Sequence, residues 1–174
     1  SPWWHYKSLV RSHLEYCCPL WNPQRGSDIK LLERVQRTFT AKIHGAQHLD
    51  YWQCLKSLHL MSLQRRRERY IIIHVWKILH GKCPNDVDIK FNDSLRRGQQ
   101  ALVPTLAKRS SQRNQTLYDQ SFAVIGPRLW NMVPPYLHSI ENLDNFKSIW
   151  RILWKRSLMN RQFLDIAAVP EIPC

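Results

Sequence analysis

The stretch from Leu63 to Gly81, LQRRRERYIIIHVWKILHG, decides the fold of this chain. Its first half carries four arginines within five positions, and its second half is apolar nearly all round. Ser62 stands where a helix N-cap belongs and Gly81 where a helix often ends, so the pattern predicts one long helix between them. We expect the C-terminal half of this helix to lie in a core and the N-terminal half to offer its charge to a partner.

The segments before and beyond this helix also have helical periodicity. Residues 6–16 gather apolar side chains near one face, and the segment 27–45 has an amphipathic pattern with a basic back. Asp50 is placed to cap a short helix, and Ser139 or Glu141 to start the last one. The expected apolar stripe of the segment 27–45 consists of Leu31, Leu32, Val35, Phe39 and Ile43.

The periodicity changes after Lys82. DVDIKF (86–91) alternates polar and apolar residues, which is typical of a strand, and QQALVP (99–104) has the pattern of a second short strand. The two segments together predict a hairpin. Residues 118–132 are expected to be helical up to Gly126 and again just after it, and VPPYL (133–137) to be a turn. The predicted fold class is mainly α, a helical bundle followed by a mixed segment with a short β-hairpin and a C-terminal helix.

The composition favours an anionic partner. The 174 residues have a net charge of +13, a field that attracts polyanions whatever the fold. Nucleic acid is the first candidate and an anionic membrane surface the second. No apolar run approaches the ~20 residues that span a bilayer, and our prediction is a nucleic-acid partner and no membrane. The first residue is not methionine and no signal peptide is visible, and the five cysteines include an adjacent pair without a CxxC motif. These features predict a piece of a longer nuclear or cytoplasmic protein with reduced thiols, not a secreted one.

Arginine side chains are the candidate binding groups, because a guanidinium presents a rigid fork of donors to phosphate. A solvated helix face is the alternative interpretation of the run at 65–69. Further basic groups in a polar loop at 108–113 and on the last helix around Arg151 favour binding. The predicted nucleic-acid-binding residues are Arg34, Arg37, Arg65, Arg66 and Arg69, then Lys108, Arg109 and Arg113, and finally Arg128.

Enzyme and metal chemistry find little support in the sequence. Two-metal phosphoryl transfer needs clustered carboxylates, and only Asp86 and Asp88 stand close together. A zinc site is the other possibility, but the spacing of its candidate ligands matches no standard finger or knuckle. We predict no catalytic residue, no metal ligand and no cofactor in this chain. The zinc candidates considered are His44, His48, Cys54 and His59.

Five segments follow one another in an informative order. They are YKSLVRSHLEYCCPLWNP (6–23), DIKLLERVQRTFTAKIHG (28–45), the stretch 51–81, RLWNMVP (128–134) and NLDNFKSIW (142–150). In this order and spacing they closely resemble the C-terminal part of non-LTR (LINE-type) retrotransposon reverse transcriptases, with the jockey-like and chicken-repeat-like clades nearest. The resemblance extends from about Tyr6 to Arg156.

The resemblance implies a thumb-like helical bundle at 5–81, a post-thumb segment at 82–160 and a loose tail at 161–174. It implies an accessory region that binds the RNA template or an RNA/DNA hybrid beside the palm and fingers of a parent RNA-directed DNA polymerase. The paired aspartates of the palm are missing, so Mg²⁺ would belong to that domain and the chain alone is expected to be inactive. The alternative is a helical protein-interaction or structural module whose charge serves solubility.

Overall fold

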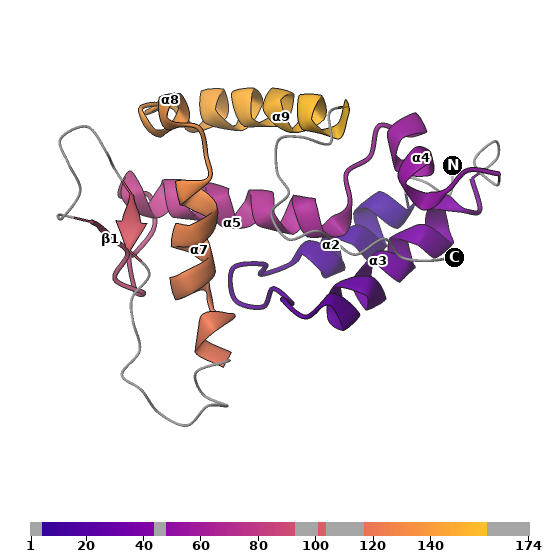
Figure 1. The fold of residues 1–174 in the computed structure, drawn as a ribbon, viewed down its shortest axis with the longest axis horizontal. Coiled ribbons are helices and arrows are strands. Elements are labelled where there is room, and N and C mark those ends of the chain that lie inside the picture. Colours follow the sequence, from indigo (N-terminus) through magenta and orange to yellow (C-terminus); the bar gives the residue numbers. More distant parts are fainter. Residues whose placement is uncertain (1–4, 44–47, 93–100, 104–116, 160–174) are drawn as a thin grey trace.

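The computed structural model describes residues 5–43, 48–92, 101–103 and 117–159, with the backbone alone at 154–159. The fold is mainly α with one short antiparallel hairpin, which confirms the predicted fold class (Figure 1). The elements in chain order are the π-helical turn η1 (Tyr6–Val10), α2 (Arg11–Glu15), α3 (Gly26–Thr40), α4 (Tyr51–Ser57), α5 (Leu63–Leu79), β1 (Lys90–Phe91), β2 (Leu102–Val103), α7 (Phe122–Asn131), α8 (Pro135–His138) and α9 (Leu143–Met159).

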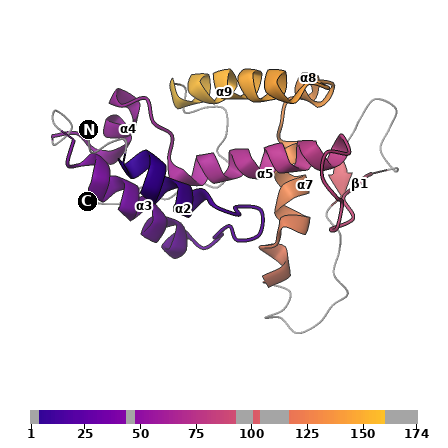
Figure 2. The same ribbon diagram turned by 180° about the vertical axis from the view of Figure 1, so that it is seen from behind.

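Helix α5 is the central element, and both of its predicted ends are confirmed. The Ser62 hydroxyl accepts a hydrogen bond from the backbone N–H of Arg65 at 3.3 Å. Gly81 has a φ of 64°, the left-handed conformation that glycine adopts without a steric cost at a helix end. The helix runs through the middle of the molecule, with α2 and α3 against its N-terminal half and α7 across its C-terminal half (Figures 1 and 2).

The C-terminal half of α5 lies in an apolar core, as predicted. Trp76 is 1% exposed, and its indole N–H donates to the backbone carbonyl of Ile140 at 2.9 Å. Phe146 of α9 sits between Trp76 and Trp130, with ring centroids 5.9 Å and 6.0 Å away. Segments beyond Gly81 therefore cover this half of the helix, and α5 is shared between the bundle before it and the elements after it.

The close crossing of α7 over α5 depends on Gly126. A Cβ atom at this position would lie 3.1 Å from Cγ2 of Val75 and 3.0 Å from the Phe122 ring. The expected break at Gly126 is wrong, because α7 continues through Pro127. A residue before proline normally leaves the α conformation through a clash that involves its Cβ, which glycine lacks.

Other boundaries differ locally from the predictions. The segment expected as a turn at 133–137 includes the short helix α8, which begins at Pro135, a residue preset for the first helical turn. The last helix is capped by neither Ser139 nor Glu141, since Asn142 Oδ1 accepts from the backbone N–H of Asp144 at 2.9 Å. The hairpin is confirmed, with Lys90 opposite Val103, although each strand has two residues.

Helix α3 buries a polar face, which corrects the expected apolar stripe. Glu33, Gln36 and Thr40 are buried, whereas Leu31 and Val35 are 55% and 39% exposed. Glu33 is bonded to both α4 and α5, since its carboxylate accepts from the Tyr51 hydroxyl of α4 and from the backbone N–H of Gln64 in α5. A buried polar face is stable when each group has a partner, and here the partners come from other elements.

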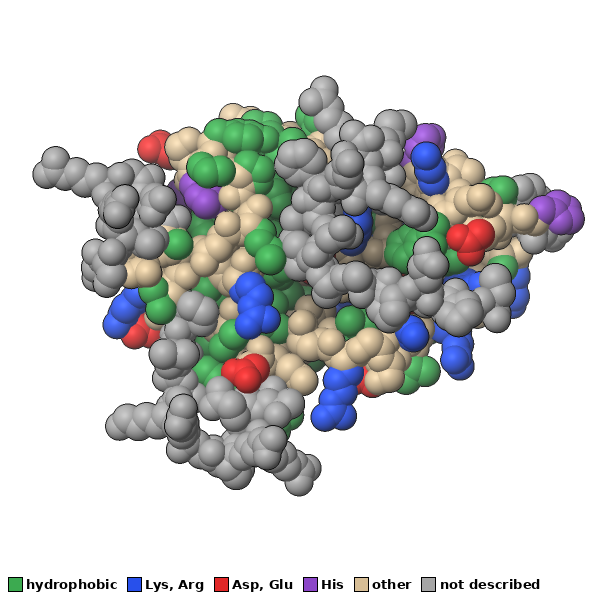
Figure 3. Space-filling model, in the orientation of Figure 1, with side chains coloured by type: hydrophobic (Ala, Val, Ile, Leu, Met, Phe, Trp, Pro, Cys, Tyr) green, Lys and Arg blue, Asp and Glu red, His purple; other side chains and the backbone are tan. Residues whose placement is uncertain are grey.

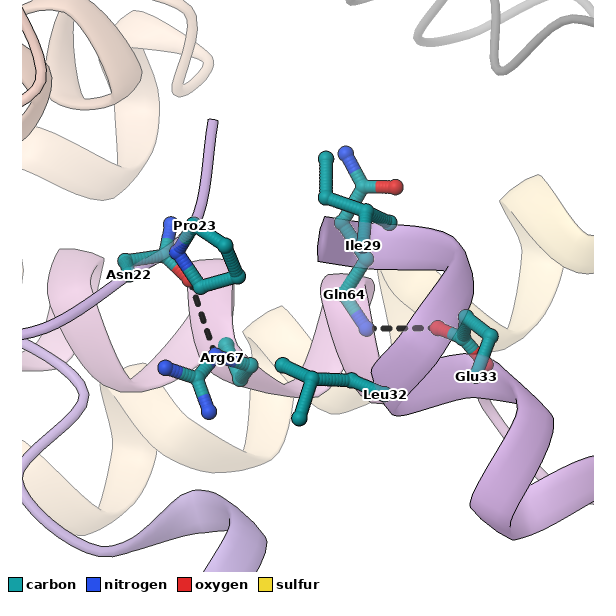
Figure 4. Close-up of a pocket in the computed structure, with 7 residues that line it drawn as sticks. All are labelled: Asn22, Pro23, Ile29, Leu32, Glu33, Gln64 and Arg67. Carbon is teal, nitrogen blue, oxygen red and sulfur yellow. Dashed lines mark hydrogen bonds between the residues drawn. The ribbon is translucent and has the colours of Figure 1, made fainter. Parts of the chain in front are cut away.

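Gln36 is the hub of this polar contact. Its side-chain oxygen accepts from the Tyr6 hydroxyl at 3.2 Å, and its amide nitrogen donates to Tyr51 Oη at 3.2 Å and to the Met61 carbonyl at 3.1 Å. Glu33 Oε1 accepts from the backbone N–H of Gln64 at 2.8 Å (Figure 4). These bonds join η1, α3, α4 and the start of α5, and they position the N-terminal half of α5 relative to α2.

Candidate nucleic-acid interface

Glu15, the last residue of α2, is the acidic centre of the region where α2 meets α5. Arg66 donates to both of its carboxylate oxygens, from Nε to Oε1 and from a terminal nitrogen to Oε2 at 2.9 Å. Arg11 approaches the same Oε1 with Nε at 3.6 Å, and the Tyr70 hydroxyl donates to Oε2 at 3.3 Å. One carboxylate is therefore already paired with two guanidinium groups, so further positive charge nearby has no local counterion.

Arg69 adds that further charge. Its Nε is buried and has no hydrogen-bond partner among the residues that the structure describes. Burial lowers the pKa of Arg69; Tyr70 opposes this shift, and the positive charges of Arg66 and Arg151 add to it. Arg151 comes from α9, so this helix contributes a further positive charge to the region of Arg69. We name Arg11, Arg66, Arg69 and Arg151 the arginine cluster.

Arg67 lies in the same run of sequence but has a structural role. It is 1% exposed and donates to Asn22 Oδ1 at 2.9 Å and to the backbone carbonyls of Leu14 and Trp21 (Figure 4). Its guanidinium carbon also lies 3.9 Å from the centroid of the Trp21 ring. Arg67 therefore holds the loop between α2 and α3 against α5 through these hydrogen bonds. It is not accessible to a phosphate, although it belongs to the same run of arginines as Arg66 and Arg69.

The other predicted contacts that the structure describes are spread over three helices. Arg34 is exposed and Arg37 half-buried on α3, Arg65 is half-buried beside Glu68 on α5, and Arg128 is exposed on α7, which packs on the far half of α5. Figure 3 shows lysine and arginine side chains at several separate places on one face of the molecule. Arg66 and Arg69 are thus the predicted residues that the arginine cluster contains. Lys108, Arg109 and Arg113 lie outside the described residues.

Comparisons with known proteins identify no relative. No family model, no curated protein and no solved structure matches this chain. Within the described ranges, no three His, Cys, Asp or Glu side chains gather where they could hold a metal ion. The part of the chain that the structure describes contains no helix of the length and hydropathy needed to cross a membrane. The proposed function therefore rests on the arginine cluster.

Arg11 was missed by sequence reasoning, and Arg151 was noted only as part of a basic helix and not as a predicted contact. Arg11 stands four residues before Glu15, a spacing that forms an ion pair on one helix face, and this spacing was the available signal. Arg151 belongs to the basic last helix, but nothing local distinguishes it from Lys147. Its proximity to Arg69 depends on how α9 packs, with Phe146 and Trp150 buried against the core.

Glu68, one turn beyond Gln64 on α5, is expected to make the stability of the protein depend on pH. Burial raises its pKa from 4.5 to about 7, although the Gln64 amide donates to it at 3.2 Å and Arg65 lies nearby. The raised pKa means that the folded state holds a proton that the unfolded state has released between pH 4.5 and 7. The contribution of Glu68 to stability is therefore complete below pH 4.5 and decreases as the pH rises towards 7.

We predict that Glu68→Gln makes the unfolding free energy less dependent on pH in this window. One pKa unit corresponds to about 1.4 kcal/mol. Between pH 4.5 and 7, the unfolding free energy of the variant should therefore rise relative to that of the native protein by at most about 3 kcal/mol. Urea unfolding at both pH values measures the difference. Glu141→Gln, at an exposed position, is the matched control and should follow the native curve. Parallel curves for Glu68→Gln and the native protein would contradict the assignment.

Proposed function

We propose that this chain binds the sugar–phosphate backbone of an RNA template or an RNA/DNA hybrid, as an accessory region of a retrotransposon reverse transcriptase. The observation that carries the proposal is the buried Nε of Arg69, which has no hydrogen-bond partner among the described residues and experiences the positive charges of Arg66 and Arg151. A desolvated cation among like charges is costly in the free protein. A bound phosphate removes that cost, because its oxygens accept from guanidinium groups with charge-assisted hydrogen bonds.

The arrangement favours backbone contact without sequence reading. The arginine cluster draws on three helices, α2, α5 and α9, and two of its members, Arg11 and Arg66, pair with the Glu15 carboxylate. Contacts to phosphates fix orientation on a nucleic acid and carry no base information. The net charge of +13 adds long-range attraction for the same ligand class. We therefore expect similar affinities for hybrids of different sequence.

The place of the chain in a larger protein is part of the proposal and rests on the resemblance of its ordered segments to non-LTR reverse transcriptases. In that setting the palm and fingers would be its protein partners, and the Mg²⁺ used in polymerisation would be held by the palm. The chain itself would grip the template while another domain performs the chemistry. We propose a nuclear or cytoplasmic ribonucleoprotein as its location.

Salt dependence of binding to an RNA/DNA hybrid tests this function. We expect the full chain to bind a short hybrid at low salt, and the logarithm of the affinity to fall linearly with the logarithm of the salt concentration. Each neutralised phosphate contributes a slope of about 0.9, so Arg69 and Arg151, the two cluster arginines without an ion pair to Glu15 among the described residues, predict a slope of at least about 2. Absence of binding at low salt would contradict the proposal and favour the alternative, an interaction or structural module.

We further predict that Glu15→Gln strengthens binding to the hybrid. The substitution removes the one carboxylate at the arginine cluster and frees Arg66 to contact phosphate. The expected gain at low salt is about threefold to tenfold, the effect of one nearby unit charge in a mostly aqueous setting. Glu141→Gln changes the net charge equally at an exposed site and should give a smaller gain. Equal gains would show that the position of the charge is unimportant.

A further inference from the structure

A groove between η1 and α3 is separate from the arginine cluster. Its volume is about 390 Å³, and Tyr6, Val10, Val35 and Phe39 supply its apolar lining. The Tyr6 and Phe39 rings stack on each other, with centroids 4.4 Å apart. Val10 and Val35 are each 39% exposed, so apolar surface remains open on both walls of the groove.

The apolar surface continues along α3 as a straight stripe. Leu31, Val35 and Phe39 are spaced by four residues, and Leu31 is 55% exposed. At a rise of 1.5 Å per residue, such a stripe extends about 12 Å, a little over two helical turns. The stripe is exposed because α3 turns its polar side, Glu33 and Gln36, to the interior. Contiguous apolar surface with a polar rim is typical of a protein-interaction site.

The groove also has a defined electrostatic character. Arg34 and Lys42 stand at its edge, both exposed, and no carboxylate is among the residues that line it. A linear apolar stripe with charged edges fits an amphipathic helix, which inserts residues at i, i+3, i+4 and i+7 into a groove. We propose that this groove binds an amphipathic helix with acidic flanks, carried by another protein domain.

Other occupants fit less well. In a contact between two copies of this groove, both sides would bring Arg34 and Lys42 and neither groove lining would supply a carboxylate, so the charges would not be complementary. Nucleic-acid bases need open aromatic faces for stacking, but Tyr6 is 1% exposed and already stacked on Phe39. The acidic helix satisfies both the apolar lining and the basic edge.

A labelled peptide tests the proposal against the full chain. The probe is a helix of about 18 residues with leucines along one face and glutamates beside them, and its matched control has lysines in place of the glutamates. Fluorescence anisotropy should show binding of the acidic peptide and at least tenfold weaker binding of the lysine peptide. Equal binding of the two peptides, or binding of neither, would overturn the proposal.

Variants of the protein locate the contact. Val10→Ser with Val35→Ser should weaken acidic-peptide binding by about tenfold or more, since two exposed valines lose their apolar contact. Arg34→Gln with Lys42→Gln should weaken it mainly at low salt. Tyr136→Ser, an exposed aromatic on α8, is the control and should have no effect.

The same serine variant distinguishes the other occupants. If it converts a dimer to a monomer in sedimentation, a second copy occupies the groove and the proposal is wrong. If it lowers affinity for the RNA/DNA hybrid by the same factor as for the peptide, the groove is a nucleic-acid surface and the proposal is also wrong. Unchanged hybrid affinity and unchanged sedimentation, together with lost peptide binding, support it. The peptide-binding and sedimentation results do not depend on whether the arginine cluster binds phosphate.

Discussion

Arg67→Ala is expected to lower the free energy of unfolding by about 3 to 5 kcal/mol, the range for breaking a buried charged network. The substitution leaves three acceptors without their donor, namely Asn22 Oδ1 and the backbone carbonyls of Leu14 and Trp21. Each buried group left unpaired costs about 1 to 3 kcal/mol, and the lost side chain also leaves a cavity. The loop between α2 and α3 would lose its attachment to α5.

Urea denaturation of the full chain measures this loss. Arg67→Lys should recover part of the stability, because an ammonium can serve some of the acceptors but lacks the planar fork and the stacking on Trp21. Arg34→Ala, at an exposed position with no ion pair among the described residues, should change stability by less than about 0.5 kcal/mol. A stable Arg67→Ala variant with weakened hybrid binding would instead make Arg67 a phosphate contact.

The sequence specified the long helix well because its signals are local. Ser62 caps α5, Gly81 ends it, and Asp50 caps α4, all as the residue types predict. The backbone N–H of Asp50 in turn donates to the Gln53 side chain. The apolar run after Tyr70 is buried because a helix that is apolar all round has no stable solvent-facing side. These features follow from residues a few positions apart, so an isolated sequence is sufficient to predict them.

Helix α3 shows where local pattern reading fails. Its amphipathic period is real, but the apolar side of an amphipathic helix is buried only if a partner covers it. Glu33 and Gln36 point inward because Tyr6, Tyr51 and Gln64, which are remote in sequence, offer hydrogen bonds. These partners lie 15 to 31 positions away along the chain, and no periodicity in the segment 27–45 encodes them. That α3 buries its polar side can therefore be recognised only from the tertiary structure.

The candidate site was predictable in part for the same reason. Successive residues on a helix point in directions about 100° apart, so the arginines within 65–69 supply both a core residue, Arg67, and outward cations. The sequence identified the run but not this division. It also identified a basic last helix, but the meeting of Arg151 with Arg69 requires the packing of α9 on the core.

Arg69→Met combined with Arg151→Met is expected to lower affinity for an RNA/DNA hybrid by about tenfold to a hundredfold at low salt. Each lost phosphate contact should also reduce the salt slope by about one. Methionine keeps much of the stem volume of arginine, so the variant removes charge with little loss of packing. Because Arg69 Nε is buried and has no partner in the part of the chain that the structure describes, its removal should leave the free protein equally stable or more stable.

This pairing of weaker binding with undiminished stability separates a ligand site from a structural one. Arg34→Met combined with Arg128→Met removes the same net charge from two exposed positions outside the arginine cluster, and it should reduce affinity much less. Equal losses in the two double variants would mean that binding depends on total charge alone. A loss of stability on replacing Arg69 and Arg151 would mean that these cations hold the fold together, and the buried nitrogen of Arg69 would then have to be explained without a phosphate.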